Sequence, residues 1–455
     1  MKSKKVYRCE KCDYESMKWM GQCPSCHEWN TLKEFEKTPT KSARIKPSLS
    51  DKTPPKRLIE VNSSQQQRFS TEISELDRVL GGGVVRDSVT SLSAPPGMGK
   101  STLLGQVSNN VAKKGTKVLY ITGEESEEQV KARAERTMGG KISENIWIKS
   151  ETNMDLIKEY IQNIDPKLII IDSIQTMYLN EYLPSRAGGV TQITTCTDEL
   201  IAIAKNQKRA IFMVVHVTKD DEMGGPKTLE HMVDTVLFID GDRQNSLRML
   251  YSQKNRFGST EEVGIFQIEE EGIISIDNPS DFFVTKRDTP VIGSVLTVSV
   301  EGSRPIIVEV ESLVCSSSYS NPMVVSTGVN KDLLKMLAAI LEQRCGIKVN
   351  DKNIYAQVTG GFKISEPAAN LGIMMAIASS SKNKPVDNKS VFIGEVGLTG
   401  EIKSTTQIIR RLKEIDRLGF KKAYISKGSL KQNLSFQNLE VIEVSTVREV
   451  IEKVF

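Results

Sequence analysis

Residues 94–102 carry the clearest potential for chemistry in this chain. They read Ala94-Pro95-Pro96-Gly97-Met98-Gly99-Lys100-Ser101-Thr102. This is one residue short of the pattern G-x-x-x-x-G-K-[ST], in which backbone N–H groups cradle phosphates, the lysine bridges the β- and γ-phosphates, and the hydroxyl binds Mg²⁺. The mismatch is Ala94, where the pattern has its first glycine, and a positive φ there would cost on the order of 1 kcal/mol. The segment predicts a site for a nucleoside triphosphate such as ATP, with Mg²⁺.

The surrounding sequence has the elements that such a loop needs. Val89 to Ser93 is an apolar stretch with strand character before the loop, and apolar residues follow it at helical spacing, at Leu103, Leu104, Val107 and Val111. From residue 70 to about 278, strand-like and helix-like segments alternate. This alternation predicts an α/β domain with a parallel sheet, whose ligands bind at the carboxyl ends of the strands.

Polar residues stand at the predicted ends of the strands that follow the loop. Asp172 closes the apolar strand that begins at Leu168, and we expect it to hold the Mg²⁺ shell through water, with a strand-capping role as the alternative. Glu124 and Glu125 follow another strand, and we favour Glu124 as the base that orients the attacking water and Glu125 as a helix cap. His216 ends a third strand, where it either contacts the γ-phosphate or is structural.

The first 35 residues form a separate module with two Cys-x-x-Cys pairs. Its four thiols belong to Cys9, Cys12, Cys23 and Cys26. A spacer of ten residues lets the two pairs face each other as a tetrahedral Cys₄ zinc site, and a disulfide pairing is the alternative. The module also has several Lys and Arg residues near Trp19 and Trp29, which either contact nucleic acid or form a solvated face around core tryptophans.

Composition sets the broad class. The chain has 455 residues, 38% of them hydrophobic and 26% charged, with a formal net charge of +4. These values are typical of a soluble globular protein of two or three domains, in which any basic groove is local. No apolar run approaches a membrane span and Met1 to Lys5 leads into no signal core, so we expect a cytoplasmic protein without a membrane partner. Cys196, Cys315 and Cys345 stand alone and are expected to be buried thiols.

Changes in composition and periodicity along the chain predict the domain boundaries. Residues 36–69 are rich in Lys, Ser, Thr, Pro and Gln without periodicity, which predicts a flexible linker. Residues 70–278 form the α/β domain. From about 285 to 455 paired strands, an amphipathic helix at 331–344, a small-residue helix at 366–380 and a basic helix at 408–418 predict an α+β domain of its own.

Several motifs give a specific resemblance. They are the Cys pairs around Trp19-Met20-Gly21, the run from Leu76 to Gly83, Gly123-Glu124-Glu125-Ser126, His216 to Lys219, Gly225-Pro226-Lys227, and Lys254-Asn255-Arg256-Phe257-Gly258. In this order, over essentially the whole chain, they resemble the RadA (Sms) family of bacterial DNA-repair ATPases. The resemblance implies a RecA-like ATPase core that acts on recombination intermediates. It further implies hexameric rings on single-stranded and branched DNA, and branch migration alongside the RecA recombinase.

The resemblance also assigns roles to further residues. Lys254 and Arg256 alternate along an extended stretch, so both cations can reach a neighbouring subunit's γ-phosphate as trans fingers; an ordinary surface pair is the alternative. Segments 182–192 and 222–230 stand where RecA-like rings grip DNA. The candidate DNA contacts are Arg186, Lys219 and Lys227.

The C-terminal region resembles the proteolytic domain of Lon, which raises a second function. The stretch that matches the catalytic serine context reads Pro367-Ala368-Ala369-Asn370, and a methyl group cannot attack a carbonyl. The catalytic lysine falls near Ile409, and Arg410 and Arg411 cannot act as bases. We therefore expect an inactive, ring-forming scaffold whose basic helix either faces DNA or is solvated. An ATP-dependent protease and a nucleotide-gated switch with zinc for partner binding are the alternative functions.

Overall fold

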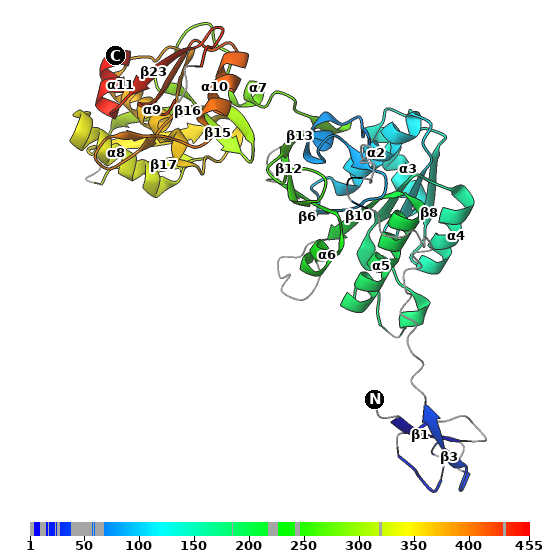
Figure 1. The fold of residues 1–455 in the computed structure, drawn as a ribbon. Helices are drawn as coiled ribbons and strands as arrows, with labels where there is room; N and C mark the ends of the chain where they lie inside the picture. The colour runs from blue at the N-terminus through cyan, green and yellow to red at the C-terminus, as the bar shows by residue number, and fades with distance from the viewer. Residues whose placement is uncertain are drawn as a thin grey trace. The chain divides into compact units, whose positions relative to one another are not determined.

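The computed structural model describes residues 4–9, 15–16, 18–22, 24, 28–37, 57, 59, 68–183, 185–216, 226–241, 246–317, 321–430 and 434–455. The chain divides into two units, Met1–Ser63 and Ser64–Phe455. Each unit is described by itself, and Figure 1 gives the element labels used below.

The first unit contains a small antiparallel sheet. Its strands are β1 (Lys4–Cys9), β2 (Glu15–Ser16) and β3 (Leu32–Lys37), in the order β2-β1-β3. The backbone of Cys9 pairs with Leu32, whereas Cys12, Cys23 and Cys26 lie outside the described residues. Trp19 and Trp29 are 57% and 68% exposed, so the alternative of core tryptophans is wrong for both.

The second unit begins with a nine-stranded sheet in the part of the chain that the structure describes. Its order is β14-β13-β12-β11-β6-β10-β9-β7-β8, in which β11 to β8 run parallel and β12, β13 and β14 are antiparallel additions. The parallel strands are β6 (Val89–Ala94), β7 (Val118–Thr122), β8 (Ile146–Ser150), β9 (Leu168–Asp172), β10 (Ala210–His216) and β11 (Thr235–Asp240). The others are β12 (Leu247–Asn255), β13 (Val263–Glu269) and β14 (Gly272–Ser275). This sheet confirms the predicted α/β core.

Helices cover both faces of this sheet, as Figure 1 shows. They are α1 (Ser74–Val79), α2 (Lys100–Lys113), α3 (Glu127–Thr137), α4 (Met154–Ile164), α5 (Val190–Gln207) and α6 (Pro226–Met232). Successive residues of the central strands point to opposite faces, so that Ile170 packs in the cluster under α1, α2 and α3 and Ile169 in the cluster under α4, α5 and α6. Burial on both faces explains why these strands read as continuous apolar runs.

A small two-stranded antiparallel sheet precedes α2 in the sequence. It pairs β4 (Arg68–Phe69) with β5 (Val84–Val85), and the turn Gly81-Gly82-Gly83 lies before β5, with φ of 78°, 106° and 114°. A Cβ on Gly83 would lie 2.6 Å from the carbonyl oxygen of Phe69. This turn therefore requires glycine both for its backbone angles and for its close packing.

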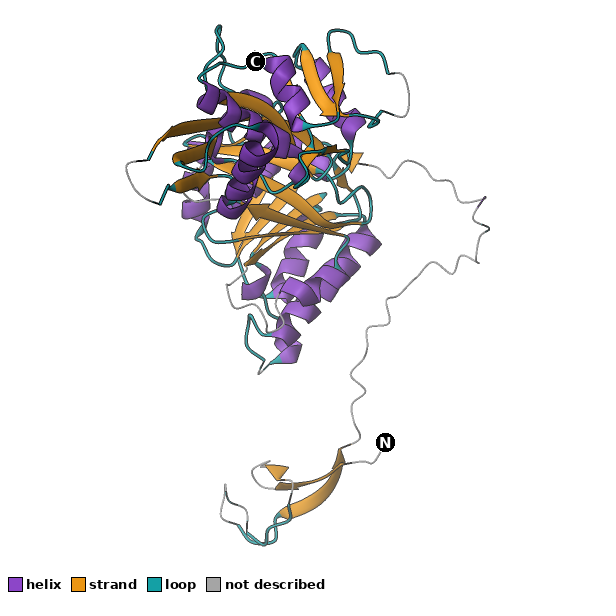
Figure 2. Cartoon of the chain, turned by 90° about the vertical axis from the view of Figure 1, so that its left-hand side faces the viewer, coloured by secondary structure: helices purple, strands orange, loops and turns teal. Residues whose placement is uncertain are grey.

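A second, seven-stranded sheet follows in the described chain. Its order is β17-β18-β16-β15-β19-β22-β23, and Figure 2 colours its strands apart from the helices that pack on it. The strands are β15 (Ser294–Glu301), β16 (Arg304–Ser316), β17 (Val324–Thr327), β18 (Lys352–Val358), β19 (Ser390–Phe392), β22 (Lys422–Ser426) and β23 (Glu440–Val444). The hairpin strands are β20 (Glu395–Val396) and β21 (Ile402–Lys403). The helices are α7 (Ser280–Phe283), α8 (Lys331–Cys345), α9 (Asn370–Lys382), α10 (Ile408–Arg417) and α11 (Val447–Val454).

Two expectations about individual residues need correction. Cys315 is exposed on β16 and Cys345 is half-buried, so only Cys196 of the three lone cysteines is a buried thiol. Arg411 is completely buried, and cannot belong to a basic face of α10 that contacts DNA. Among the described residues, none of the helices has the length and apolarity needed to cross a bilayer.

Candidate nucleotide site

The glycine-rich loop connects the end of β6 to the start of α2. Gly97 and Gly99 have φ of 80° and 92°, which a residue with a Cβ rarely adopts. Ala94 is the last residue of β6, is fully buried and does not have a positive φ. Because Ala94 has the backbone conformation of an ordinary strand residue, it is not strained. Its methyl group packs in the core under α2. The two glycines that the turn needs are both present.

Lys100 opens α2 and is 5% exposed. Its Nζ donates to the carbonyl oxygen of Ala94 at 2.9 Å and approaches that of Pro95 at 3.5 Å. Burial lowers the pKa of the ammonium group, while the carboxylates of Asp172 and Glu124 act in the opposite direction. The lysine therefore lies close to the two acidic residues that the sequence assigned to the same site.

Asp172 ends β9 beside Thr122, the last residue of β7. Its side chain is buried, and Oδ2 accepts a hydrogen bond from Tyr120 Oη at 2.7 Å. Burial, reinforced by the neighbouring Asp172, raises the pKa of Tyr120 well above its ordinary value, so the phenol stays a donor. A carboxylate fixed in this way at the carboxyl edge of the sheet suits a cation or its water shell.

Glu124 lies two residues after the end of β7, with its carboxylate close to Ser173, the residue after Asp172. Gly123 makes this approach possible, because its N–H donates to the carbonyl oxygen of Asp172 at 2.7 Å and a Cβ there would lie 1.9 Å from Thr176 Oγ1. Glu124 Oε1 accepts from Ser173 Oγ at 2.6 Å. The same oxygen lies 3.2 Å from His216 Nε2.

His216 ends β10, paired in register with Ala94. Its carbonyl oxygen accepts from Gln175 Nε2 at 3.1 Å, which fixes the backbone. Although His216 Nε2 is close to Glu124, it lacks hydrogen-bond geometry, so this buried nitrogen has no hydrogen-bond partner among the residues that the structure describes. The strand ends thus bring Lys100, Asp172, Glu124 and His216 to one edge of the sheet.

Glu125 points elsewhere. Arg133 Nη1 donates to both of its carboxylate oxygens at 2.5 Å. Ser126 caps α3 instead, in a capping box with Gln129, so the expected role of Glu125 as the helix cap is wrong. Because its carboxylate is bound to Arg133 on α3, Glu125 does not belong to the group around Lys100.

Lys254 and Arg256 lie on the far side of β11 from the phosphate loop. Lys254 Nζ donates to the carbonyl oxygen of Glu230 at 2.8 Å, at the end of α6, and burial together with Arg256 lowers its pKa. Arg256 follows β12, and its side chain is 55% exposed, with Nη1 3.5 Å from Asp234 Oδ1. Within the described part of the chain, the hydrogen bonds and ion pairs of these two cations go to Glu230, His231 and Asp234 and not to the phosphate loop.

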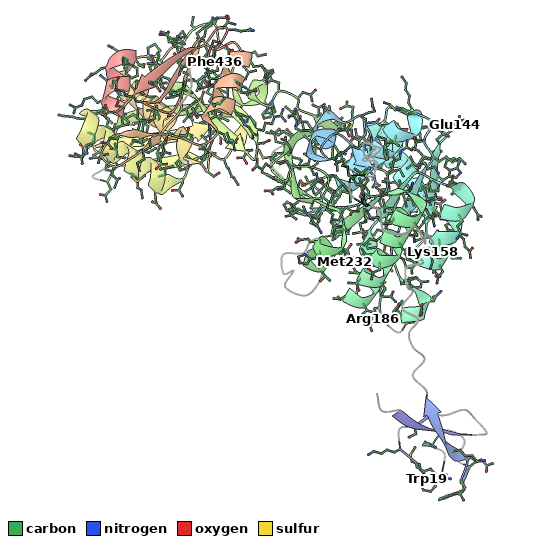
Figure 3. All side chains as sticks on the ribbon, in the orientation of Figure 1. Trp19, Glu144, Lys158, Arg186, Met232 and Phe436 are labelled. Atoms are coloured by element: carbon green, nitrogen blue, oxygen red, sulfur yellow. The ribbon has the colours of Figure 1, made fainter. Side chains whose placement is uncertain are left out.

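The three candidate DNA-contacting residues differ in how much of each the structure describes. Arg186 is exposed in the segment between residues 180–182 and α5, as Figure 3 shows, and the exposed Tyr182 and Leu183 lie nearby in the sequence. Lys219 lies outside the described residues. Lys227 is on α6, where only its backbone is described.

In the C-terminal domain, Ala368 is 5% exposed; this is the residue that the sequence resemblance places at the position of the catalytic serine of Lon. The buried Arg411 donates to Glu366 through Nη1 at 2.8 Å and Nη2 at 2.6 Å, and also to the carbonyl oxygen of Val298 at 2.8 Å. A bidentate ion pair with a permanently charged arginine offers neither a nucleophile nor a base.

Sequence reasoning missed four residues around the candidate side chains. Tyr120, Ser173 and Asp234 contact Asp172, Glu124 and Arg256, respectively, and Arg68 donates to the backbone of Phe257, the residue after Arg256. Ser173 follows Asp172 directly and could have been suspected. The other three had no signal, because their partners lie far away in the sequence.

Comparison with known proteins agrees with this arrangement. Residues 54–222 match the model of an AAA domain, and residues 7–34 match that of a rubredoxin metal binding domain. The chain is 42% identical to the DNA repair protein RadA of Bacillus subtilis (strain 168) over 453 residues, which cover 99% of this chain and 98% of the relative. It is 43% identical to RadA of Streptococcus pyogenes serotype M1, covering 100% and 99%, and 40% identical to RadA of Listeria monocytogenes, covering 98% and 97%. The chain therefore belongs to the RadA family of DNA repair proteins.

Proposed function

We propose that this protein is a DNA-stimulated ATPase motor that binds single-stranded DNA and drives branch migration on recombination intermediates. The observation that carries this proposal is the convergence of Lys100, Asp172, Glu124 and His216 at the strand ends around the phosphate loop. Each of these residues alone would be weak evidence for a site of triphosphate hydrolysis. Their meeting at one edge of the sheet, in a member of the RadA family, favours triphosphate hydrolysis.

The residues present fit ATP and Mg²⁺. The loop glycines orient N–H groups toward the β-phosphate, and Lys100 exchanges its bond to Ala94 for the phosphate oxygens. Ser101 would supply a hydroxyl ligand to Mg²⁺ and Asp172 would hold the water shell of the ion, which would neutralise charge on the triphosphate. Glu124 orients the attacking water, and His216 Nε2 supplies the contact that senses the γ-phosphate.

Hydrolysis requires positive charge beside the γ-phosphate, which Lys254 and Arg256 supply from a neighbouring subunit in this proposal. Both cations lie away from the phosphate loop of their own chain, and Arg256 has an exposed side chain. This arrangement favours a ring, which we propose to be hexameric. Arg186, Lys219 and Lys227 then face the DNA backbone inside the ring, and RecA is the proposed partner recombinase.

The test of the motor is the rate of ATP hydrolysis with and without single-stranded DNA, together with displacement of a strand from a branched substrate. We expect DNA to raise the rate and ATP to be required for displacement. A rate that DNA does not change would favour the nucleotide-gated switch instead.

The protease alternative is disfavoured by Ala368 and the ion pair between Arg411 and Glu366. We expect no cleavage of casein by the purified protein with ATP. We also expect none after Ala368→Ser, because Arg411 stays charged and Glu366 is bound to it, so that neither can activate the new hydroxyl. Robust cleavage by either protein would overturn our assignment of the C-terminal domain as a scaffold.

The proposed cofactor of the first unit is one Zn²⁺ ion held by Cys9, Cys12, Cys23 and Cys26, as the match to a metal binding domain supports. Such a small module has little core, so the metal supplies much of its folding energy. We also propose that the protein is cytoplasmic, where thiols stay reduced and available to the metal.

A further inference from the structure

The guanidinium group of Arg68 contacts both the nearby glycine turn and a segment that lies 189 residues further along the chain. Nη1 donates to the carbonyl oxygens of Leu80 at 2.8 Å and Gly83 at 3.3 Å, at the two ends of the glycine turn. Nη2 donates to the carbonyl oxygen of Phe257 at 2.6 Å. One planar side chain thus binds the turn before β5 to the segment after β12.

One further hydrogen bond and a close backbone approach hold the same segments together. Asn255 Nδ2 donates to the carbonyl oxygen of Val79 at 3.2 Å, while Asn255 Oδ1 accepts from the N–H of Phe257 at 2.9 Å. The backbones also touch, because a Cβ on Gly81 would lie 3.3 Å from the Cα of Gly258. Gly81 and Gly258 therefore permit an approach that larger residues would prevent.

Arg256 lies between these anchors. Its neighbours Asn255 and Phe257 are both fixed to the region of α1 and the glycine turn, and its own N–H donates to the carbonyl oxygen of Asp234 at 3.1 Å. Its side chain remains 55% exposed. Its Nη1 also lies 3.5 Å from Asp234 Oδ1, at the long end of ion-pair distances. A fixed backbone with an exposed tip is what a side chain that must reach a defined point on another molecule requires.

We infer that Arg68 is a positioning residue for Arg256: it sets the backbone from which the Arg256 guanidinium reaches a neighbouring subunit's γ-phosphate. This inference rests on the proposed role of Arg256 as a trans finger. The Arg68 side chain donates to the backbone carbonyl oxygens of Leu80, Gly83 and Phe257, and thereby supports the backbone next to Arg256 rather than the phosphate loop of its own chain.

The first experiment compares Arg68→Ala, Arg256→Ala and the control Arg86→Ala, an exposed arginine close to the same turn. ATP binding and DNA-stimulated hydrolysis are measured for each full-length protein. We expect unchanged ATP binding in all three. Hydrolysis falls on the order of 10³-fold for Arg256→Ala and on the order of 10- to 100-fold for Arg68→Ala, and Arg86→Ala matches the wild type.

A double variant separates positioning from a general loss of stability. If Arg68 acts through Arg256, Arg68→Ala produces no further fall in hydrolysis when Arg256 is already alanine. Independent, multiplying losses would overturn the inference. Loss of ATP binding by Arg68→Ala would overturn it as well, because Arg68 would then support the site of its own chain.

Mixing variant subunits gives a measurement that a purely structural role of Arg68 would not change. Lys100→Ala subunits have an intact Arg256 but no working phosphate loop. Arg68→Ala subunits have a working phosphate loop but a misplaced Arg256. We expect mixtures of the two to regain hydrolysis, as mixtures of Lys100→Ala with Arg256→Ala do. Recovery in the second mixture without recovery in the first would contradict the positioning role.

Arg68→Lys provides a second test in case Arg68→Ala does not fold. A lysine keeps the charge and most of the stem but has no planar fork, so we expect partial recovery of hydrolysis. Wild-type hydrolysis by folded Arg68→Lys and Arg68→Ala would refute the inference. Wild-type hydrolysis by Arg256→Ala would instead refute the proposed trans finger.

Discussion

Lys100 Nζ donates a hydrogen bond to the carbonyl oxygen of Ala94, 2.9 Å away, so the lysine of the phosphate loop is held by the first residue of that loop. The bond closes the loop at the one position where the sequence departs from the usual pattern. It also keeps a buried ammonium group paired, which offsets part of the cost of its burial.

Lys100→Ala should abolish ATP hydrolysis, because no other cation bridges the β- and γ-phosphates from within the same loop. The measurement is the steady-state rate with single-stranded DNA. Hydrolysis that persists and still responds to DNA would mean that the phosphate site lies elsewhere in the chain.

Ala94→Gly should leave the affinity for ATP within about twofold of the wild type, since Ala94 has strand geometry and gains nothing from the freedom of glycine. The protein should lose roughly 0.5 to 1 kcal/mol of stability, because glycine weakens a strand. Equilibrium binding of a fluorescent ATP analogue and denaturant unfolding measure the two quantities. A clear gain in affinity would show that the alanine does impair the loop.

Glu124→Gln should retain ATP binding and lose hydrolysis by on the order of 10²- to 10⁴-fold, because an amide cannot act as a base. Glu125→Gln is the matched control, since its carboxylate is bound to Arg133. It should keep most of the hydrolysis. The reverse ranking of the two variants would transfer the role of base to Glu125.

Glu301 provides a pH-dependent prediction for the C-terminal domain. Burial, aided by Glu366, raises its pKa from 4.5 to about 7. Between these values the folded state binds more protons than the unfolded state, so stability falls as the pH rises through this window. Allowing for partial exposure, wild type should lose on the order of 1 to 2 kcal/mol relative to Glu301→Gln between pH 4.5 and 7.5. Urea unfolding at several pH values tests this, with the exposed Glu452→Gln as the control. Parallel pH profiles for wild type and Glu301→Gln would contradict it.

Glu366→Gln should destabilise the protein by about 3 to 5 kcal/mol, because it leaves the charge of Arg411 buried without its carboxylate partner. The free energy of unfolding in denaturant is the measurement. Adding Arg411→Met to Glu366→Gln should recover part of the loss, since no unpaired charge then remains. A double variant less stable than Glu366→Gln would show that Arg411 has another essential partner.

The sequence predicted the α/β core well, because the phosphate loop and the apolar strands are local patterns. Val89 to Ser93 was expected as a strand and Val89–Ala94 forms one, and the helix after the loop begins at Lys100. The positions of Asp172, Glu124 and His216 at the carboxyl edge of the sheet were predictable for the same reason, since each ends or closely follows a recognisable strand.

Burial and orientation were harder to predict. Arg411 lies in a basic run that reads as a surface helix, yet it is buried against Glu366, which is 45 residues earlier in the chain. Cys315 was expected inside and is exposed. Helical or strand periodicity gives the face on which a side chain lies, but not which face the rest of the fold covers.

The sequence by itself therefore determined the phosphate loop, the strand-end carboxylates and the membership of a family, because each depends on residues close together in the chain. Only the tertiary structure decided that Glu124 rather than Glu125 faces Lys100, that Ala94 bears no strain, and that Arg68 holds the segment around Arg256. These facts depend on contacts between residues that are distant in sequence, such as Arg68 and Phe257, and no local pattern encodes such pairs.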